Sequence, residues 1–211
     1  DDGVSMVTVS AGLVHNSGAP GRNWRAFDEE LDVPRHRQLT GLLREKGCKA
    51  VLQLEHAGPA ARSWPRWSSS SIRQRERASC WRMPNFLIRR IIDSFTKPAR
   101  LAQQSGYDGV EIHAADHSLA AAFLSPAINH RRDAWGATQL ARFKFVLDIV
   151  RGIRKAAGED FIIGVHFNLV ELSPHGADWA EMLRFTQMLR IAGTDYLRPE
   201  FGGFENRGGC G

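Results

Sequence analysis

Short apolar runs with β-strand character alternate along this sequence with longer segments of helical periodicity. The strand-like runs cover residues 4–10, 49–54, 110–113, 161–167 and 195–197, and the helical segments cover 28–46, 85–105, 139–157 and 178–192. Such alternation is typical of βαβ units, in which a helix returns the chain to the same edge of a sheet. The sequence therefore predicts an α/β fold with a parallel sheet and right-handed crossovers.

A barrel fits this alternation better than an open dinucleotide-binding sheet does. The first strand is not followed by a GxGxxG motif, and polar residues end several strands instead of one switch point. We expect an incomplete (β/α)8 barrel of the TIM type, because about five strands are recognisable where a full barrel has eight. Residues 1–211 would form this single partial domain, with a long irregular basic loop at 62–83 and a glycine-rich tail at 200–211.

The composition favours a cytoplasmic protein and argues against two classes of partner. The apolar runs fall well short of the roughly 18 residues of a membrane span, so we expect no membrane partner. The three cysteines, Cys48, Cys80 and Cys210, match no zinc or CxxC pattern, which suits a reducing compartment. The net charge of +5 comes largely from residues 62–90, where no nucleic-acid recognition motif accompanies it. We therefore expect no nucleic-acid partner.

One stretch places ionisable side chains just past the end of a strand. The run at 110–113 stops at His113, and the chain continues into Asp116, His117 and Ser118. Parallel sheets and barrels build their sites at the carboxyl ends of the strands. This edge is therefore the expected location of an active site.

The same stretch carries a family resemblance. It matches, in order, a pattern of the form GVEIHGAHGYL…FLSPxxNxRxDxWGG through Gly109-Val110-Glu111-Ile112-His113, Leu119, Phe123-Leu124-Ser125-Pro126, Asn129, Arg131, Asp133 and Trp135-Gly136. The segment resembles the old yellow enzyme family, the FMN-dependent NADH:flavin oxidoreductases and ene-reductases. The resemblance covers nearly all of this chain but only the middle portion of the family's domain. It implies FMN as the cofactor, NAD(P)H as the reductant and an enone-like small molecule as the substrate.

The resemblance assigns roles to four residues. Gln53, in LQLEHAG, would hydrogen-bond the pyrimidine edge of the flavin, because an amide can both donate and accept. Ala11 is the small residue at which the backbone approaches the flavin. His166, in GVHFN, stands near the flavin N1 where the family has an arginine. His113 is the first member of a His-x-x-His/Asn pair that polarises the oxygen of the substrate.

Three positions depart from the family pattern and predict impaired catalysis. Asp116 replaces the second hydrogen-bond donor of the pair, and an ionised carboxylate only accepts hydrogen bonds. Ser118 replaces the tyrosine that protonates the substrate, and its hydroxyl is shorter and far less acidic. His166 is only partly charged near neutral pH, so it would stabilise a reduced flavin less than an arginine does. With His113, Asp116 and Ser118 as the catalytic positions, we expect weak FMN binding and poor enone reduction.

Two alternatives stay open from the residues alone. Glu111, His113, Asp116 and His117 would form the metal cluster of a barrel hydrolase, since alternation sends Glu111 and His113 to one face of the strand. We favour a site without metal ligands. The other alternative is a non-catalytic barrel fragment, because five strands without closure leave two sheet edges open. Such edges also predict self-association of the chain.

Overall fold

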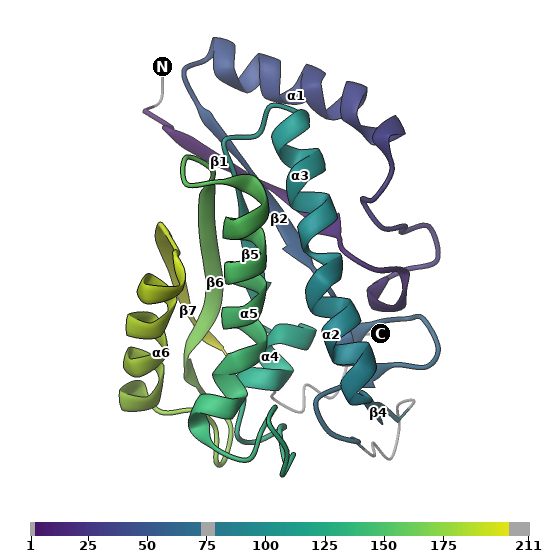
Figure 1. Cartoon of the computed structure of the whole chain (residues 1–211), viewed down its shortest axis with the longest axis vertical. Coiled ribbons are helices and arrows are strands. Elements are labelled where there is room, and N and C mark those ends of the chain that lie inside the picture. Colours follow the sequence, from purple (N-terminus) through teal and green to yellow (C-terminus); the bar gives the residue numbers. More distant parts are fainter. Residues whose placement is uncertain (1–2, 73–78, 203–211) are drawn as a thin grey trace.

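The computed structural model describes residues 3–72 and 79–202. Parallel strands form a five-stranded sheet in the order β1-β2-β5-β6-β7, which confirms the five strands expected from the sequence. Their bounds are β1 Met6–Leu13, β2 Lys49–Glu55, β5 Gly109–Ala114, β6 Ile162–Glu171 and β7 Tyr196–Gly202. The sheet is half of a barrel, as the expected incomplete (β/α)8 fold requires, and β1 and β7 are its two edges (Figure 1).

Helices pack along one face of this sheet (Figure 1). Their bounds are α1 Val33–Glu45, α2 Asn85–Ser94, α3 Thr96–Gln104, α4 Leu119–Leu124, α5 Gln139–Ala157 and α6 Trp179–Ala192. Helix α5 contacts α2, α3, α4 and α6, so it lies at the centre of the helical layer.

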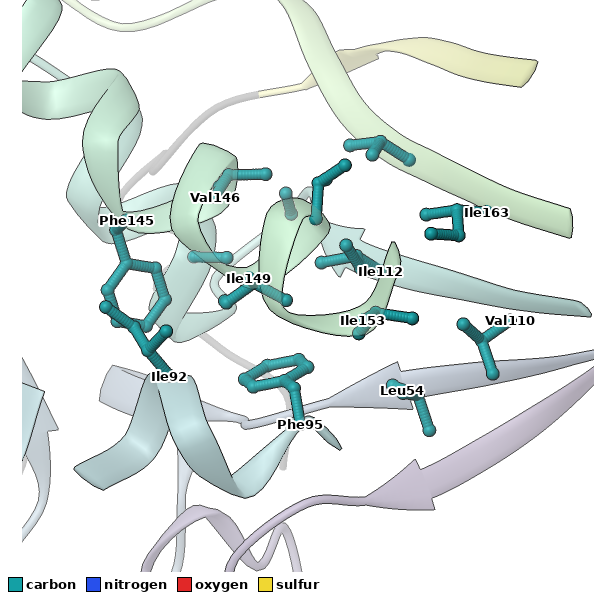
Figure 2. Packing of buried hydrophobic residues seen from close by; sticks show 14 of the residues in the cluster. Leu54, Ile92, Phe95, Val110, Ile112, Phe145, Val146, Ile149, Ile153 and Ile163 are labelled. Carbon is teal, nitrogen blue, oxygen red and sulfur yellow. The ribbon is translucent and has the colours of Figure 1, made fainter. Parts of the chain in front are cut away.

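The hydrophobic core lies between the sheet and this helical layer. Figure 2 shows strand residues Leu54, Val110, Ile112 and Ile163 pointing toward helix residues Ile92, Phe95, Val146, Ile149 and Ile153. The strand residues are apolar at alternate positions, because successive side chains point to opposite faces of a sheet. Removing one such side chain from water contributes about 1.5–3 kcal/mol, so this layer supplies much of the stability that holds the strands in register.

The inner face of the sheet carries polar side chains at strand positions that alternate with the core residues. The register pairs Gln53 with Glu111 across β2 and β5, and His113 with His166 across β5 and β6. It also pairs His166 with Arg198 across β6 and β7. Residues in register on neighbouring strands point to the same face, so these side chains meet inside the half-barrel.

Tyr196 of β7 reaches across the inner face toward the opposite edge of the sheet. Its ring lies over Gly164, where an added Cβ would come within 2.1 Å of a ring carbon. Its hydroxyl donates to Glu111 Oε2 at 3.0 Å and also hydrogen-bonds the side chain of Thr8 in β1. Side chains from the two edge strands, Thr8 of β1 and Tyr196 of β7, therefore meet on the inner face.

Several element boundaries differ from the expected ones. Strand β1 continues past residue 10 to Leu13, because Gly12 and Leu13 pair with Leu54 and Glu55 of β2 after a register shift. The helix expected from residue 28 begins as α1 at Val33, since Pro34 occupies the first turn, where a missing N–H costs nothing. Strand β7 extends to Gly202, so residues 200–202 belong to the sheet. The rest of the predicted tail, 203–211, lies outside the described residues.

The remaining strand ends and loops also differ in detail. Strands β5 and β6 extend beyond their expected ends, β6 by four residues to Glu171, and the six-residue helix α4 had not been expected. The segment 62–83 contains two short paired strands, β3 Trp67–Ser68 and β4 Trp81–Arg82. The helix expected at 85–105 is divided into α2 and α3 at Phe95, and Pro98 lies in the first turn of α3. In the described part of the chain, no helix is long and apolar enough to cross a membrane.

Candidate active site

Polar side chains from four neighbouring strands form a hydrogen-bonded group on the inner face of the half-barrel, toward the carboxyl ends of the strands. We call this group the strand-end cluster; it consists of Gln53, Glu111, His113, His166, Tyr196, Arg198 and Glu200. Three of the predicted site residues, Gln53, His113 and His166, are thus brought together by the fold. Their strands β2, β5 and β6 lie side by side in the sheet, as expected for a site at this edge.

Glu111 lies at the centre of the strand-end cluster with a fully buried side chain. Its carboxylate accepts hydrogen bonds from Gln53 Nε2 at 2.8 Å and from the Tyr196 hydroxyl at 3.0 Å. Arg198 Nη2 lies 3.1 Å from Glu111 Oε1 and supplies the opposite charge. A buried carboxylate is tolerated only when it is paired and hydrogen-bonded in this way. Burial, and next the nearby Glu111, raise the pKa of Tyr196, which keeps its hydroxyl a donor.

His113 and His166 form a pair beside Glu111. Their Nδ1 atoms are 3.1 Å apart, and the two rings are tilted by 40° with their centres separated by 5.1 Å. His166 Nδ1 also lies 2.6 Å from Arg198 Nη2, and His166 Nε2 lies 2.7 Å from Glu200 Oε2. Burial, followed by the neighbouring His166, lowers the pKa of His113 to about 4. His113 is therefore a neutral imidazole near pH 7.

Asp116 and Ser118 lie in the turn that follows β5. Asp116 is exposed and has a positive φ of 52°, and its backbone N–H donates to Asn168 Oδ1 at 3.2 Å. Its side chain therefore lies at the surface and outside the strand-end cluster. Ser118 is buried and forms the N-cap of α4, where its Oγ accepts a hydrogen bond from the Ala121 N–H at 3.2 Å. This contact gives Ser118 a structural role, and its role as proton donor stays a prediction.

His56 lies just after β2, and its side chain forms hydrogen bonds with residues of two loops. Its Nδ1 accepts a hydrogen bond from the Gly58 N–H at 3.0 Å, so its Nε2 carries the hydrogen and contacts Ser17 Oγ at 3.0 Å. Burial, and next the nearby His15, lower the pKa of His56 to about 3. Ala11 lies within β1, and its predicted approach to the flavin stays a prediction.

Sequence reasoning missed three members of the strand-end cluster, Tyr196, Arg198 and Glu200. The last strand had been expected to end at residue 197, which cut off the alternation that places these three residues on one face. Glu111 had been considered only as a metal ligand. Among the residues that the structure describes, no three His, Cys, Asp or Glu side chains are grouped so that they could hold a metal ion.

Comparison with known proteins identifies the family. Residues 2–198 match the family model of the NADH:flavin oxidoreductase / NADH oxidase family. The chain is 32% identical over 201 residues to a probable N-methylproline demethylase of Rhizobium meliloti, covering 92% of this chain and 29% of that protein. It is 30% identical over 217 residues to an NADH:acrylate oxidoreductase of Vibrio harveyi, covering 95% of this chain and 21% of that protein. The chain thus spans less than a third of the length of these curated relatives.

Solved structures agree on the fold. A 2-naphthoyl-CoA reductase in complex with 2-naphthoyl-CoA superposes with a TM-score of 0.89 at 24% identity, over 97% of this chain and 34% of that one. The old yellow enzyme homologue from Zymomonas mobilis gives a TM-score of 0.82 at 19% identity, over 96% of this chain and 61% of that one. The family implies FMN and NAD(P)H as cofactors. This chain belongs to the NADH:flavin oxidoreductase / NADH oxidase family, the family of the old yellow enzymes, and contains part of its barrel domain.

Proposed function

We propose that this chain forms the substrate face of an FMN-dependent oxidoreductase that passes a hydride from NAD(P)H to an activated C=C bond or a similar acceptor. The convergence of Gln53, His113 and His166 in one strand-end cluster carries this proposal. They are three of the six positions, with Ala11, Asp116 and Ser118, for which the family pattern implies contact with flavin or substrate.

The donors of the strand-end cluster suit the polar edge of a flavin ring. That edge alternates hydrogen-bond acceptors with a donor, which an amide and a guanidinium together match. The side chain of Gln53 is buried and held by Glu111, so its amide is oriented before any ligand binds. Arg198 is 45% exposed and lies against His166, so a permanent cation is present where the family's arginine is replaced. Gln53 and Arg198 would therefore hold the ring, and FMN when bound supplies the hydride carrier.

The residues at the substrate-binding positions of the family pattern support a slow reaction with simple enones. His113 is the residue of the family pair that is retained, and it belongs to the strand-end cluster. The position of the second donor is occupied by the exposed Asp116, and a carboxylate accepts hydrogen bonds instead of donating them. Ser118 caps α4 with its hydroxyl oxygen, and its hydroxyl is shorter and far less acidic than the tyrosine of the family pattern. A single imidazole without a partner polarises a carbonyl less than two donors do, so the rate should fall.

The proposal is tested by anaerobic reduction of the chain loaded with FMN. Addition of NADH or NADPH is expected to bleach the flavin absorption, and 2-cyclohexenone is expected to restore it slowly. His113→Ala should slow the second step without affecting the first. His130→Ala, which changes an exposed histidine outside the strand-end cluster, serves as the matched control. Flavin that binds but is bleached by neither nucleotide would contradict the proposal and favour a non-catalytic barrel fragment.

We also propose that the chain works in the cytoplasm and self-associates through its open sheet edges. The free thiols of Cys48 and Cys80 support a reducing compartment. Strand β7 presents Leu197 and Phe201 with exposed fractions of 40% and 73%, and unpaired strand edges favour pairing between chains. Light scattering during size-exclusion chromatography is expected to show dimers or larger species that Phe201→Lys reduces. A monomer at all concentrations would contradict this.

A further inference from the structure

Glu55 is a carboxyl group at the end of β2 that lies outside the strand-end cluster. Leu52 and Leu54 of the same strand belong to the core on the helical face of the sheet. Successive side chains of a strand point to opposite faces, so Gln53 and Glu55 both point to the inner face. Glu55 therefore lies on the same side of the sheet as the strand-end cluster, and closer than Gln53 to the carboxyl end of β2.

The pairing of β2 with β5 places Glu55 next to His113. The register pairs Gln53 with Glu111, and the same register, continued by two residues along both parallel strands, sets Glu55 opposite His113. Neighbouring strands lie about 4.8 Å apart, so these two side chains flank the same space over the inner face. A ligand with an oxygen at His113 therefore reaches Glu55 with a group that is only a few atoms away.

The carboxyl group of Glu55 differs from that of Glu111 in its partners. Glu111 accepts hydrogen bonds from Gln53 and Tyr196 and pairs with Arg198. Within residues 3–72 and 79–202, Glu55 receives neither a hydrogen bond nor an ion pair on its carboxyl group, although its side chain is half-buried. This burial raises the pKa of Glu55. A desolvated carboxylate without a partner costs free energy, which a bound cation would offset.

The inner face around Glu55 is rich in carboxyl groups and open to solvent. The strand-end cluster contributes the carboxyl groups of Glu111 and Glu200 and one guanidinium, that of Arg198. With Glu55 this makes three carboxyl groups against one guanidinium, although the whole chain has a net charge of +5. The side chains of Arg198 and Glu200 are 45% and 32% exposed, so a ligand can approach from the inner side. These charges favour a cationic ligand over a neutral one.

We propose that Glu55 is a specificity-determining residue that selects a substrate with a protonated or quaternary amine close to the oxygen bound at His113. The inference deepens the proposed function and rests on it in placing that oxygen at His113. It names the substrate class as a cationic enone or acrylic ester, in which a short chain joins the amine to the activated C=C bond.

The charge of the substrate also affects the reaction itself. Transfer of a hydride to the β-carbon of an enone leaves negative charge on the oxygen that His113 holds. An ionised Glu55 beside that oxygen opposes this charge, because like charges a few ångströms apart repel each other strongly in a partly buried site. An ammonium group between the two offsets the repulsion. A neutral enone has no such group, which gives a second reason for its slow reduction.

The selection is measured first as binding to the full chain without flavin. Choline and 3,3-dimethylbutan-1-ol have the same shape and differ in one positive charge, and each is titrated into the ¹⁵N-labelled chain and followed by two-dimensional NMR. Choline is expected to bind roughly tenfold more tightly, which corresponds to about 1.4 kcal/mol. Equal binding of the two probes, tighter binding of the neutral alcohol, or no saturable binding of choline would overturn the proposal.

Three variants test whether Glu55 is the cause of this preference. Glu55→Gln removes the charge at nearly constant shape, so it should lower the affinity for choline to that for the alcohol. Glu55→Asp keeps the charge and should retain the preference. Glu159→Gln changes an exposed carboxylate in the turn before β6, at the amino end of that strand, and should change nothing. An unchanged affinity for the alcohol shows that each variant is folded. A preference that survives in Glu55→Gln would refute the role of Glu55.

The same comparison is then made with two acrylic esters as substrates of the FMN-loaded chain. Acryloylcholine is expected to have a kcat/KM roughly tenfold above that of 3,3-dimethylbutyl acrylate, mainly through a lower KM, and Glu55→Gln should abolish the difference. Equal kcat/KM values for the two esters in the wild type would overturn the selection. A chain that prefers choline but reduces neither ester would contradict the proposed function and leave the selection by Glu55 supported.

Discussion

Replacing His56 with glutamine is expected to remove much of the loss of stability that this fold suffers on mild acidification. His56 is 2% exposed, and its pKa falls from 6.5 to about 3 because burial excludes the charged form. Below pH 6.5 the unfolded chain binds a proton at this residue that the folded chain cannot bind. The folded state therefore has its full stability above pH 6.5 and loses stability as the pH falls from 6.5 toward 3.

The size of this stability loss follows from the pH interval between the unfolded and folded pKa values of His56. Each pH unit between the unfolded and folded pKa values costs about 1.4 kcal/mol per group, so acidification to about pH 5 should cost about 2 kcal/mol through His56. His113, whose pKa is about 4, adds a loss of the same sign in both proteins. It therefore cancels when the wild type is compared with His56→Gln.

Urea unfolding followed by tryptophan fluorescence measures this loss, since the chain has six tryptophans. The free energy of unfolding is determined at about pH 7 and about pH 5 for each protein, and only the difference between the two pH values is compared. Glutamine does not titrate, so His56→Gln should show about 2 kcal/mol less pH dependence than the wild type. His130→Gln, at an exposed histidine, should retain the wild-type dependence. If His56→Gln loses as much stability on acidification as the wild type, the reasoning is refuted.

Three further substitutions test the packing that positions the site, each by the free energy of unfolding in urea. Ser118→Ala removes the N-cap of α4 and should cost about 1 kcal/mol. Phe123→Ala empties a fully buried position and should cost about 3–5 kcal/mol. Gly164→Ala places a methyl group 2.1 Å from the ring of Tyr196 and should cost about 1–3 kcal/mol. Its control is Gly41→Ala, which has open space around it and should stabilise α1 by about 0.5–1 kcal/mol.

Each of these predictions has an outcome that contradicts it. An unchanged stability in Ser118→Ala would mean that the hydroxyl does not cap α4. A loss below about 1 kcal/mol in Phe123→Ala would mean that the helical layer is not closely packed at this point. A Gly164→Ala protein as stable as Gly41→Ala would mean that Tyr196 does not lie across the inner face of the sheet.

The order of strands and helices was predictable because apolar periodicity records which face of each element is buried. Val110 and Ile112 alternate with Glu111 and His113, and the structure sends the first pair to the core and the second to the inner face. The ends of the strands were less predictable. Residues 196–202 read as Tyr-Leu-Arg-Pro-Glu-Phe-Gly. Their proline and charges are unusual in a strand, and they form an edge strand that pairs with β6.

The candidate site was predicted only where residues lie in a family motif. Gln53, His113 and His166 were found in this way, and the fold brings them together. Arg198 could not be found from the motif, because its meaning depends on the pairing of β7 with β6, which places it beside His166. The capping role of Ser118 was missed for a similar reason, since the short helix α4 that it begins had not been expected.

Titration of the purified chain with FMN is the most direct test of the central claim, that this half-barrel carries the flavin-facing part of an oxidoreductase site. Flavin fluorescence and visible absorption are followed for the wild type, for Gln53→Ala and for the control Gln103→Ala. Gln103 is an exposed amide on α3 that contacts the Ala157 carbonyl and lies outside the strand-end cluster. Saturable binding in the micromolar range that is lost in Gln53→Ala and kept in Gln103→Ala is the predicted result. No binding at several hundred micromolar FMN, or binding that Gln53→Ala leaves unchanged, would contradict the claim.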